Sequence, residues 1–290
     1  MTPGRGAPSR DLVVYAAGGG MRGIFGAGAL HAIAEMGARD QLLAVYGLSA
    51  GALNAAHFAL GTTMRAMEWY LHHVPVHGIL ARATPVALLR GEDMVDVPEA
   101  ERVLAAEHLV DGEALSRCAF PVRFGAIDRH GLDFCWLDAR RPDAIRVLLA
   151  SSTIFPFVHD GVAIDGVTYI DGGYREGVCY RRLRHEHPDA RLLLVLNDTE
   201  QESIVRRAAV GAVIRLRDER LAEVWLDTCD RTQSELAEAL AAPRALVLRP
   251  DEGFPVHITT TDQAVLAHGF WLGYRAVLTE RERLQRFLAG

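Results

Sequence analysis

The first sixty residues alternate between short apolar runs and longer stretches with helical periodicity. Residues 12–17 and 42–46 are rich in β-branched, aliphatic and aromatic side chains, which is typical of buried strands. Small and apolar residues at helical spacing follow over 23–36 and 52–60, and Gly37 stands where a helix C-cap is expected. This order of strand, helix, strand, helix predicts a parallel sheet with helices on its faces.

The remainder of the chain continues the α/β pattern and adds more helix. Further strands are predicted at residues 120–128, 132–137, 162–164, 167–170, 191–196 and 245–248. Helices are predicted at residues 141–150, 200–241 and 262–288, the last with Thr261 or Asp262 as its N-cap. The dipeptide Asp165-Gly166 between two of the strands is typical of a tight hairpin turn.

The domain organisation follows from length and composition. With 290 residues, half of them apolar, the chain can bury a large core. We expect a flexible polar segment at 1–10 and a single domain over 11–290. Within it, residues 62–115 are helical in character and rich in Met, His and aromatic side chains, and we expect this region to contribute a lid over the site. From about residue 200 the chain is predicted to form a helical C-terminal extension.

Charge and cysteine usage exclude several classes of function. The formal net charge is −6, and every one of the 31 basic residues is Arg, so the chain has no basic tail for nucleic acid and no Lys for a Schiff base. The four cysteines stand at positions 118, 135, 179 and 229, too far apart for a zinc knuckle or a disulfide framework. We therefore expect free thiols, no metal site, no cofactor and no nucleic-acid partner.

The chain shows no apolar signal region and no apolar stretch long enough to span a membrane. We expect a cytoplasmic protein that is at most peripheral at a membrane. A transient membrane contact would use Arg181, Arg182 and Arg184 or the apolar face of the C-terminal helix. The pattern leaves the oligomeric state open.

The most informative motif is Gly47-Leu48-Ser49-Ala50-Gly51, which lies between a predicted strand and a predicted helix. This G-x-S-x-G spacing is that of a nucleophile elbow, a turn so tight that only glycine avoids a clash two residues either side of the serine. The turn exposes the Ser49 hydroxyl at the N-terminus of the helix, where developing negative charge is favoured. Ser49 is therefore the candidate nucleophile.

A second glycine motif, Gly18-Gly19-Gly20-Met21-Arg22-Gly23, also joins a strand to a helix. Consecutive glycines can present their backbone N–H groups to one point, either as a phosphate cradle or as an oxyanion hole. A Walker loop needs Lys, which the chain lacks, and a dinucleotide site needs an acidic residue where the serine elbow stands. The oxyanion hole is the better interpretation.

A third motif, Asp171-Gly172-Gly173, follows a predicted strand, and it could place a rigid carboxylate as general base for Ser49 or be a plain turn. A conventional triad would instead need a histidine late in the chain, and His257 and His268 are the candidates. Lone histidines at such positions are usually structural or exposed, so the triad is the minor alternative.

These blocks together resemble the patatin-like phospholipase family. The family pattern joins a G-G-G-x-[RK]-G loop, a G-x-S-x-G elbow, an A-S-x-x-x-P segment, here Ala150 to Pro156, and a D-G-[GA] block, and all occur in order. The resemblance implies a three-layer α/β/α sandwich with a mostly parallel sheet. It also implies Ser49 as nucleophile and Asp171 as base.

For the oxyanion hole, the resemblance implies backbone amides of Gly18, Gly19 and Gly20, with Arg22 at the basic position that braces the loop. Ser151 and Pro156 are expected to give structural support. Beyond residue 174 the resemblance is weak, so it assigns no role to the later helices.

The function expected from this reasoning is a serine hydrolase of lipid acyl esters, of phospholipase A, lysophospholipase or carboxylesterase type. It would form an acyl-enzyme and release it to water. Two alternatives remain: an acyltransferase that uses the same dyad with an alcohol or thiol acceptor, and a binding or regulatory protein of the same fold with little turnover.

Overall fold

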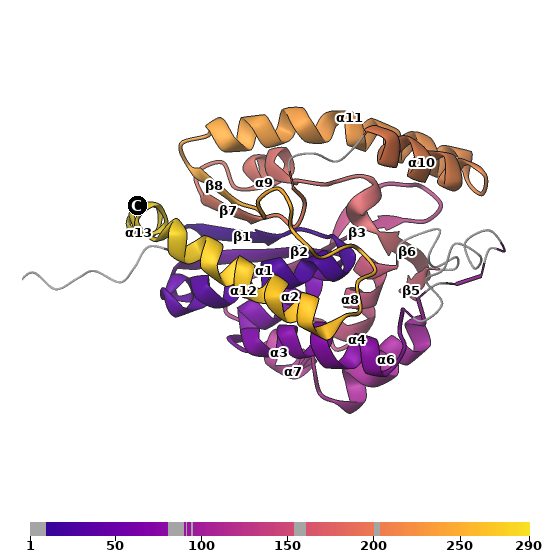
Figure 1. The fold of residues 1–290 in the computed structure, drawn as a ribbon, viewed down its shortest axis with the longest axis horizontal. Coiled ribbons are helices and arrows are strands. Elements are labelled where there is room, and N and C mark those ends of the chain that lie inside the picture. The colour runs from indigo at the N-terminus through magenta and orange to yellow at the C-terminus, as the bar shows by residue number, and fades with distance from the viewer. Residues whose placement is uncertain (1–9, 81–89, 91, 94, 154–160, 200–203) are drawn as a thin grey trace, which may run out of the picture.

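The computed structural model describes residues 10–80, 90, 92–93, 95–153, 161–199 and 204–290 (Figure 1). Its eight strands form one sheet in the order β5-β6-β3-β2-β1-β7-β8, with β4 paired to β3 outside this path. The strands are β1 (Leu12–Ala16), β2 (Leu42–Leu48), β3 (Val122–Asp128), β4 (Phe134–Asp138), β5 (Val162–Ile164), β6 (Val167–Asp171), β7 (Arg191–Val195) and β8 (Ala245–Leu248). Five neighbouring strands, β3-β2-β1-β7-β8, run parallel, and β4, β5 and β6 are antiparallel to their partners.

Helices cover both faces of this sheet. The longer ones are α1 (Gly23–Glu35), α2 (Ala50–Leu60), α6 (Val97–Ala106), α8 (Ala144–Ser152), α10 (Ile204–Arg215), α11 (Glu219–Ala241), α12 (Gln263–Thr279) and α13 (Arg281–Ala289). The shorter ones are η1 (Gly20–Arg22), η2 (Ala38–Gln41), α3 (Thr63–Glu68), η3 (Trp69–His73), α4 (Val74–Val76), α7 (Gly112–Ser116), η4 (Gly172–Tyr174) and α9 (Tyr180–Glu186). In Figure 1, α9, α10 and α11 lie on one side of the sheet, and α1, α2 and α12 lie on the other.

The central strands are apolar on both faces because helices cover both. Every residue of β1 is buried. Leu12 and Val14 belong to the large core shared with α1 and α2, whereas Val13 and Tyr15 belong to a second cluster that includes Leu183 of α9. Continuous apolar runs of this kind are the mark of a parallel sheet buried on both sides. The predicted three-layer α/β/α fold is confirmed.

Helix α12 packs directly against α1, although the two lie at opposite ends of the chain. A Cβ added at Gly28 of α1 would lie 1.9 Å from the carbonyl oxygen of Phe270 in α12. A Cβ added at Gly273 of α12 would lie 2.0 Å from the carbonyl oxygen of Phe25 in α1. Glycine on each helix therefore lets the two backbones touch, which fixes the C-terminal helix on the core.

Two predicted helices are each divided in the structure. The predicted helix 200–241 is wrong as one element: α10 ends at Arg215 and α11 begins at Glu219. The side chain of Asp218 caps α11 by accepting from the N–H of Leu221 at 2.9 Å, and it also pairs with Arg129 of the β3–β4 turn at 2.7 Å. This long-range ion pair is not visible in helical periodicity.

The predicted helix 262–288 is likewise two helices, α12 and α13, which meet at Glu280. Its predicted N-cap is confirmed, because the Asp262 side chain accepts from the N–H of Val265. Helix α9 was not predicted at all. It begins after Cys179, whose φ of 56° lies in the left-handed region, so neither a polar cap nor a glycine marks its start.

The described parts of the expected lid region join the main core. Tyr70, Val74, Val103, Leu104 and Leu115 are each at most 3% exposed and belong to the cluster that contains α1 and α2. A lid over the site remains a prediction, since residues 81–89, 91 and 94 lie outside the described residues, as does the expected flexible segment up to residue 9.

Candidate active site

Sheet register brings the three sequence motifs to one edge. Ala16 of β1 pairs with Gly47 of β2, so the chain after β1 emerges beside the elbow. Leu48 of β2 pairs with Gly125 of β3, and the next residue of β3, Ala126, pairs with Asp171 of β6. Strand β3 therefore lies between Ser49 and Asp171, and its residues at this point, Gly125 and Ala126, are small.

Ser49 has strained backbone geometry. It is the residue before α2, with φ 55° and ψ −128°, a conformation that non-glycine residues rarely adopt. Strain of this kind costs about 1–3 kcal/mol and persists only where the surroundings impose it. The side chain is half-buried at the corner between β2 and α2.

The flanking glycines explain how the turn is imposed. A Cβ on Gly51 would lie 2.1 Å from the carbonyl oxygen of Ala16, and a Cβ on Gly47 would lie 2.6 Å from the Cα of Ala52. Both contacts are with backbone atoms that cannot move aside. The steric reason given for the G-x-S-x-G spacing therefore applies here, and the elbow closes tightly against β1.

Asp171 ends β6 and is 1% exposed. Burial raises its pKa to about 6, while the Ser49 hydroxyl and the backbone N–H of Gly173 act in the opposite direction and lower it. Its Oδ1 accepts the Gly173 N–H at 2.7 Å. Its Oδ2 has no partner with full hydrogen-bond geometry among the described residues, so the Ser49 hydroxyl is near this carboxylate without being fully aligned to it.

Ser151 connects the serine elbow to β3 through hydrogen bonds. Its hydroxyl accepts the backbone N–H of Ser49 at 3.0 Å and donates to the carbonyl of Gly125 in β3 at 2.6 Å. It is fully buried, so it cannot meet substrate. This agrees with the supporting role expected for it; the Pro156 of the same sequence block lies outside the described residues.

The glycine loop lies against Ser49. A Cβ on Gly18 would be 3.0 Å from the Cβ and 3.7 Å from the Oγ of Ser49. Gly19 and Gly20 both have positive φ, 143° and 56°, and a Cβ on Gly20 would lie 2.6 Å from the side chain of Ile258. Among the described residues, no acceptor receives the backbone N–H of Gly18 or of Gly19. The N–H of Gly18 is therefore available in the residue that lies against Ser49, and the N–H of Gly19 is available next to it in the loop.

Arg22 contacts the glycine loop through its side chain. Its Nε donates to the carbonyl of Gly19 at 3.3 Å, and its Nη1 forms an ion pair with Asp198 at 2.5 Å. Its backbone N–H is bonded to the same Gly19 carbonyl at 3.2 Å. Arg22 is therefore placed to brace the loop rather than to donate its own N–H.

Sequence reasoning missed Asn197. This residue follows β7, is 2% exposed, and donates from Nδ2 to the carbonyls of Ala17 at 2.7 Å and Gly18 at 3.1 Å. The available signal was a polar pair, Asn197-Asp198, directly after a buried strand. In a parallel sheet such residues lie at the same edge as the other strand ends.

The two candidate triad histidines do not join the site in this structure. His257 and His268 are both exposed, whereas Asp171 is buried. Within the described part of the chain, no hydrogen bond or ion pair links either histidine to Ser49 or Asp171. Asp171, and neither histidine, interacts with Ser49 among the described residues.

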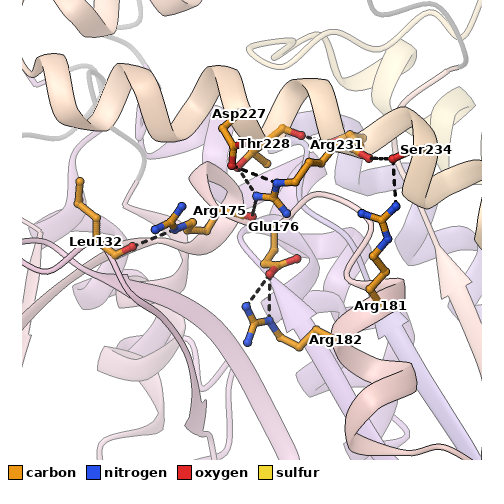
Figure 2. Close-up of polar contacts among 10 residues, drawn as sticks. Leu132, Arg175, Glu176, Arg181, Arg182, Asp227, Thr228, Arg231 and Ser234 are labelled. Carbon is orange, nitrogen blue, oxygen red and sulfur yellow. Dashed lines mark hydrogen bonds and ion pairs between the residues drawn. The ribbon is translucent and has the colours of Figure 1, made fainter.

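Helix α11 holds the segment that follows Asp171 (Figure 2). Arg231 of α11 donates to the carbonyl of Arg175 at 3.2 Å, and the buried carboxylate of Glu235 accepts the backbone N–H of Arg181 at 2.8 Å. Glu176 in the same segment pairs with Arg182 at 2.6 Å. Helix α11 thus anchors the segment that follows Asp171, a role that the sequence did not indicate.

The arginine cluster considered for membrane contact is largely occupied within the chain. Arg182 pairs with Glu176 (Figure 2). Arg181 pairs with Glu238 at 2.6 Å, and Arg184 donates to the carbonyls of Pro188 and Ala190. Their charge is therefore less available to anionic lipid than the sequence implied. No helix among the described residues is both long and apolar enough to cross a bilayer.

No disulfide joins any two of the four cysteines: Cys179 and Cys229 are buried, and Cys118 and Cys135 are half-buried. The described residues contain no group of three or more His, Cys, Asp or Glu side chains that could hold a metal ion.

The chain is similar to known proteins in its N-terminal sequence and in its fold. A family model described as Patatin-like phospholipase matches residues 16–75, which include the glycine loop and the serine elbow. This segment of the chain is patatin-like. This match confirms the resemblance inferred from the motifs and the class it implies, a hydrolase of carboxylic esters. The blocks around Ser151 and Asp171 lie beyond the matched residues.

Solved structures that are similar to this chain include VipD from Legionella pneumophila, at 15% identity and a TM-score of 0.49 over 97% of this chain and 67% of that one. The type III effector ExoU matches at 15% identity, TM-score 0.42, over 98% and 54%. ExoU in complex with SpcU, from Pseudomonas aeruginosa, matches at 18% identity, TM-score 0.36, over 98% and 52%. The chain thus spans about half to two thirds of these proteins. No curated protein matches it closely enough to count as a relative.

Proposed function

We propose that this protein hydrolyses fatty-acyl esters of lipids through a Ser49–Asp171 dyad and an acyl-enzyme intermediate. The observation that carries the proposal is the pairing of a strained serine on an elbow with a buried carboxylate whose pKa is raised to about 6. The patatin-like match over residues 16–75 supports the ester-hydrolase class, and the lipid substrate follows from that resemblance.

The proposed acylation begins as Ser49 Oγ attacks the ester carbonyl carbon. The hydroxyl proton passes to Asp171, whose Oδ2 has no other hydrogen-bond partner among the described residues. Because a serine hydroxyl is a far weaker acid than a carboxylic acid, proton transfer must be concerted with attack. Burial helps here, since a carboxylate of raised pKa is a stronger base than an exposed one.

Negative charge then develops on the former carbonyl oxygen. Gly18 lies against Ser49, and the free N–H groups of Gly18 and Gly19 would donate to this oxyanion, while the N-terminus of α2 adds a favourable dipole. Collapse of the tetrahedral intermediate breaks the bond to the alcohol, which takes the proton from Asp171. A water molecule then attacks the acyl carbonyl carbon as Asp171 takes its proton. The bond between the acyl group and Ser49 Oγ breaks, Asp171 returns the proton to Oγ, and the fatty acid leaves.

A p-nitrophenyl acyl ester tests the dyad directly. Ser49→Ala should lower kcat/KM at least about 10³-fold, and Asp171→Asn should lower it to a similar extent, because each removes a partner in one proton transfer. His257→Ala serves as the control, and it should retain wild-type turnover. The assignment of Asp171 as base is wrong if Asp171→Asn retains activity, and the triad replaces it if His257→Ala does not.

A further inference from the structure

Asn197 makes hydrogen bonds that the proposed chemistry does not yet use. Its Nδ2 donates to two consecutive carbonyls of the loop, Ala17 at 2.7 Å and Gly18 at 3.1 Å, and its Oδ1 accepts the N–H of Gly26 in α1 at 2.9 Å. All three polar contacts are made by one side chain that is 2% exposed. Asn197 therefore ties the glycine loop both to the end of β7 and to the start of α1.

The direction of a carbonyl fixes the direction of the next N–H. In a trans peptide the C=O of one residue and the N–H of the following residue lie in one plane and point in opposite directions. When Asn197 holds the carbonyl of Ala17, the N–H of Gly18 must point away from Asn197. Asn197 also holds the carbonyl of Gly18, so the N–H of Gly19 must likewise point away from Asn197. Neither of these N–H groups has an acceptor among the described residues.

The loop needs such a constraint because glycine has little preference of its own. Gly19 has φ 143° and Gly20 has φ 56°, values that glycine can leave at small cost. Arg22 constrains the next peptide in the same way, since its Nε bonds to the Gly19 carbonyl at 3.3 Å. A Cβ on Gly19 would lie 3.0 Å from the Cβ of Asn197, so the asparagine also packs against the loop.

We propose that Asn197 is the positioning residue of the oxyanion hole: by holding the Ala17 and Gly18 carbonyls, it aims the N–H groups of Gly18 and Gly19 at the oxygen that becomes negative. This inference rests on the proposed function. Asn197 does not touch the substrate itself, and its effect is exerted through the loop.

Asn197→Asp tests the idea with little change of volume. The carboxylate keeps an acceptor for Gly26 but replaces the Nδ2 donor by an oxygen that faces two carbonyl oxygens. Asn54→Asp is the matched control. Asn54 is 1% exposed, and its Nδ2 donates to the carbonyl of Gly23 at 2.8 Å. That carbonyl precedes an N–H inside α1, not one in the glycine loop.

Three measurements separate positioning from general support. With p-nitrophenyl butyrate, Asn197→Asp should lower kcat by about 10²-fold with little change in KM, because oxyanion donors act in the transition state. The inhibition constant of an alkyl trifluoromethyl ketone, whose hemiketal oxygen would occupy the same hole, should rise by a similar factor. In ¹H–¹⁵N spectra of the free protein, the amide resonances of Gly18 and Gly19 should shift.

Asn54→Asp should show a much smaller loss of kcat and unshifted Gly18 and Gly19 resonances. The proposal is overturned if the two variants lose kcat and inhibitor affinity equally, or if the two glycine resonances stay in place in Asn197→Asp. The spectra do not depend on turnover. They therefore report the orientation of the Gly18 and Gly19 N–H groups even if wild type and Ser49→Ala hydrolyse esters equally poorly. That last result would count against the proposed function instead.

Discussion

At the scale of single residues, Ser49 and Asp171 each occupy a position that is unfavourable for stability. Ser49 has a backbone conformation that favours glycine, and Asp171 carries a carboxylate into a fully buried site. Neither feature stabilises the fold. Strain and desolvation of this kind concentrate at functional sites, where the surrounding structure maintains them.

The raised pKa of Asp171 makes activity depend on pH. A general base must be ionised, so wild-type kcat/KM should rise with pH through about 6 and level off above it. A plot of kcat/KM against pH measures this midpoint. Asp189→Asn, which changes an exposed carboxylate before β7, should leave the midpoint where it is. An activity that is flat between pH 4 and 8, or that falls as pH rises, would contradict the assignment.

The same pKa gives a prediction for stability. The folded pKa of Asp171 is raised above the ordinary value of an unfolded chain, so its contribution to stability is fully present below pH ~4 and is lost as pH rises through about 6. Asp171→Asn removes this dependence. Its free energy of unfolding should exceed that of wild type by about 2–3 kcal/mol at pH 8, and the difference should vanish near pH 4. Urea unfolding at the two pH values tests this.

At the scale of elements, the contact between α1 and α12 attaches the end of the chain to its beginning. Gly273→Ala places a methyl group 2.0 Å from a backbone oxygen of α1, so the helices must separate. We expect a loss of about 1–3 kcal/mol in the free energy of unfolding. His268→Ala, on an exposed position of the same helix, should change it by less than about 0.5 kcal/mol. Equal effects of the two variants would show that the helices are not in tight contact.

The sequence predicted elements well where the evidence was local. The hairpin at Asp165-Gly166 has φ values of 52° and 81°, as its turn residues suggested, and Asp262 caps α12. The prediction of helix boundaries failed where contacts between residues far apart in the chain determine them. Asp218 interrupts the expected helix at 200–241 by capping α11 and pairing with Arg129, and α9 starts at a cysteine without a capping side chain.

At the scale of the whole molecule, the sheet order determines the site. Parallel β1 and β2 bring the glycine loop and the serine elbow together, and the antiparallel pairing of β6 with β3 brings in Asp171. Helix α11 covers the other face and holds the residues after Asp171. The site is therefore assembled from three separate regions of the chain.

In the proposed mechanism, backbone N–H donors and a helix N-terminus stabilise the negative charge of the transition state, a role that a metal ion can have in other hydrolases. We predict that dialysis against EDTA leaves kcat/KM for a p-nitrophenyl ester unchanged, and that added Ca²⁺ does not raise it. A Ser49→Ala sample under the same conditions gives the background rate. Loss of activity in EDTA that Ca²⁺ restores would contradict the metal-free chemistry proposed here.

The sequence by itself determined the strand–turn–helix units, the glycine loop, the elbow and the identity of the candidate nucleophile and base. These follow from periodicity and from steric limits at single turns, both of which act between near neighbours. Only the tertiary structure decided the nearness of Ser49 to Asp171, the raised pKa of Asp171, and the parts played by Asn197 and α11. Each of these depends on burial or on contacts between residues far apart in the chain, and the order of residues alone does not specify which of them meet.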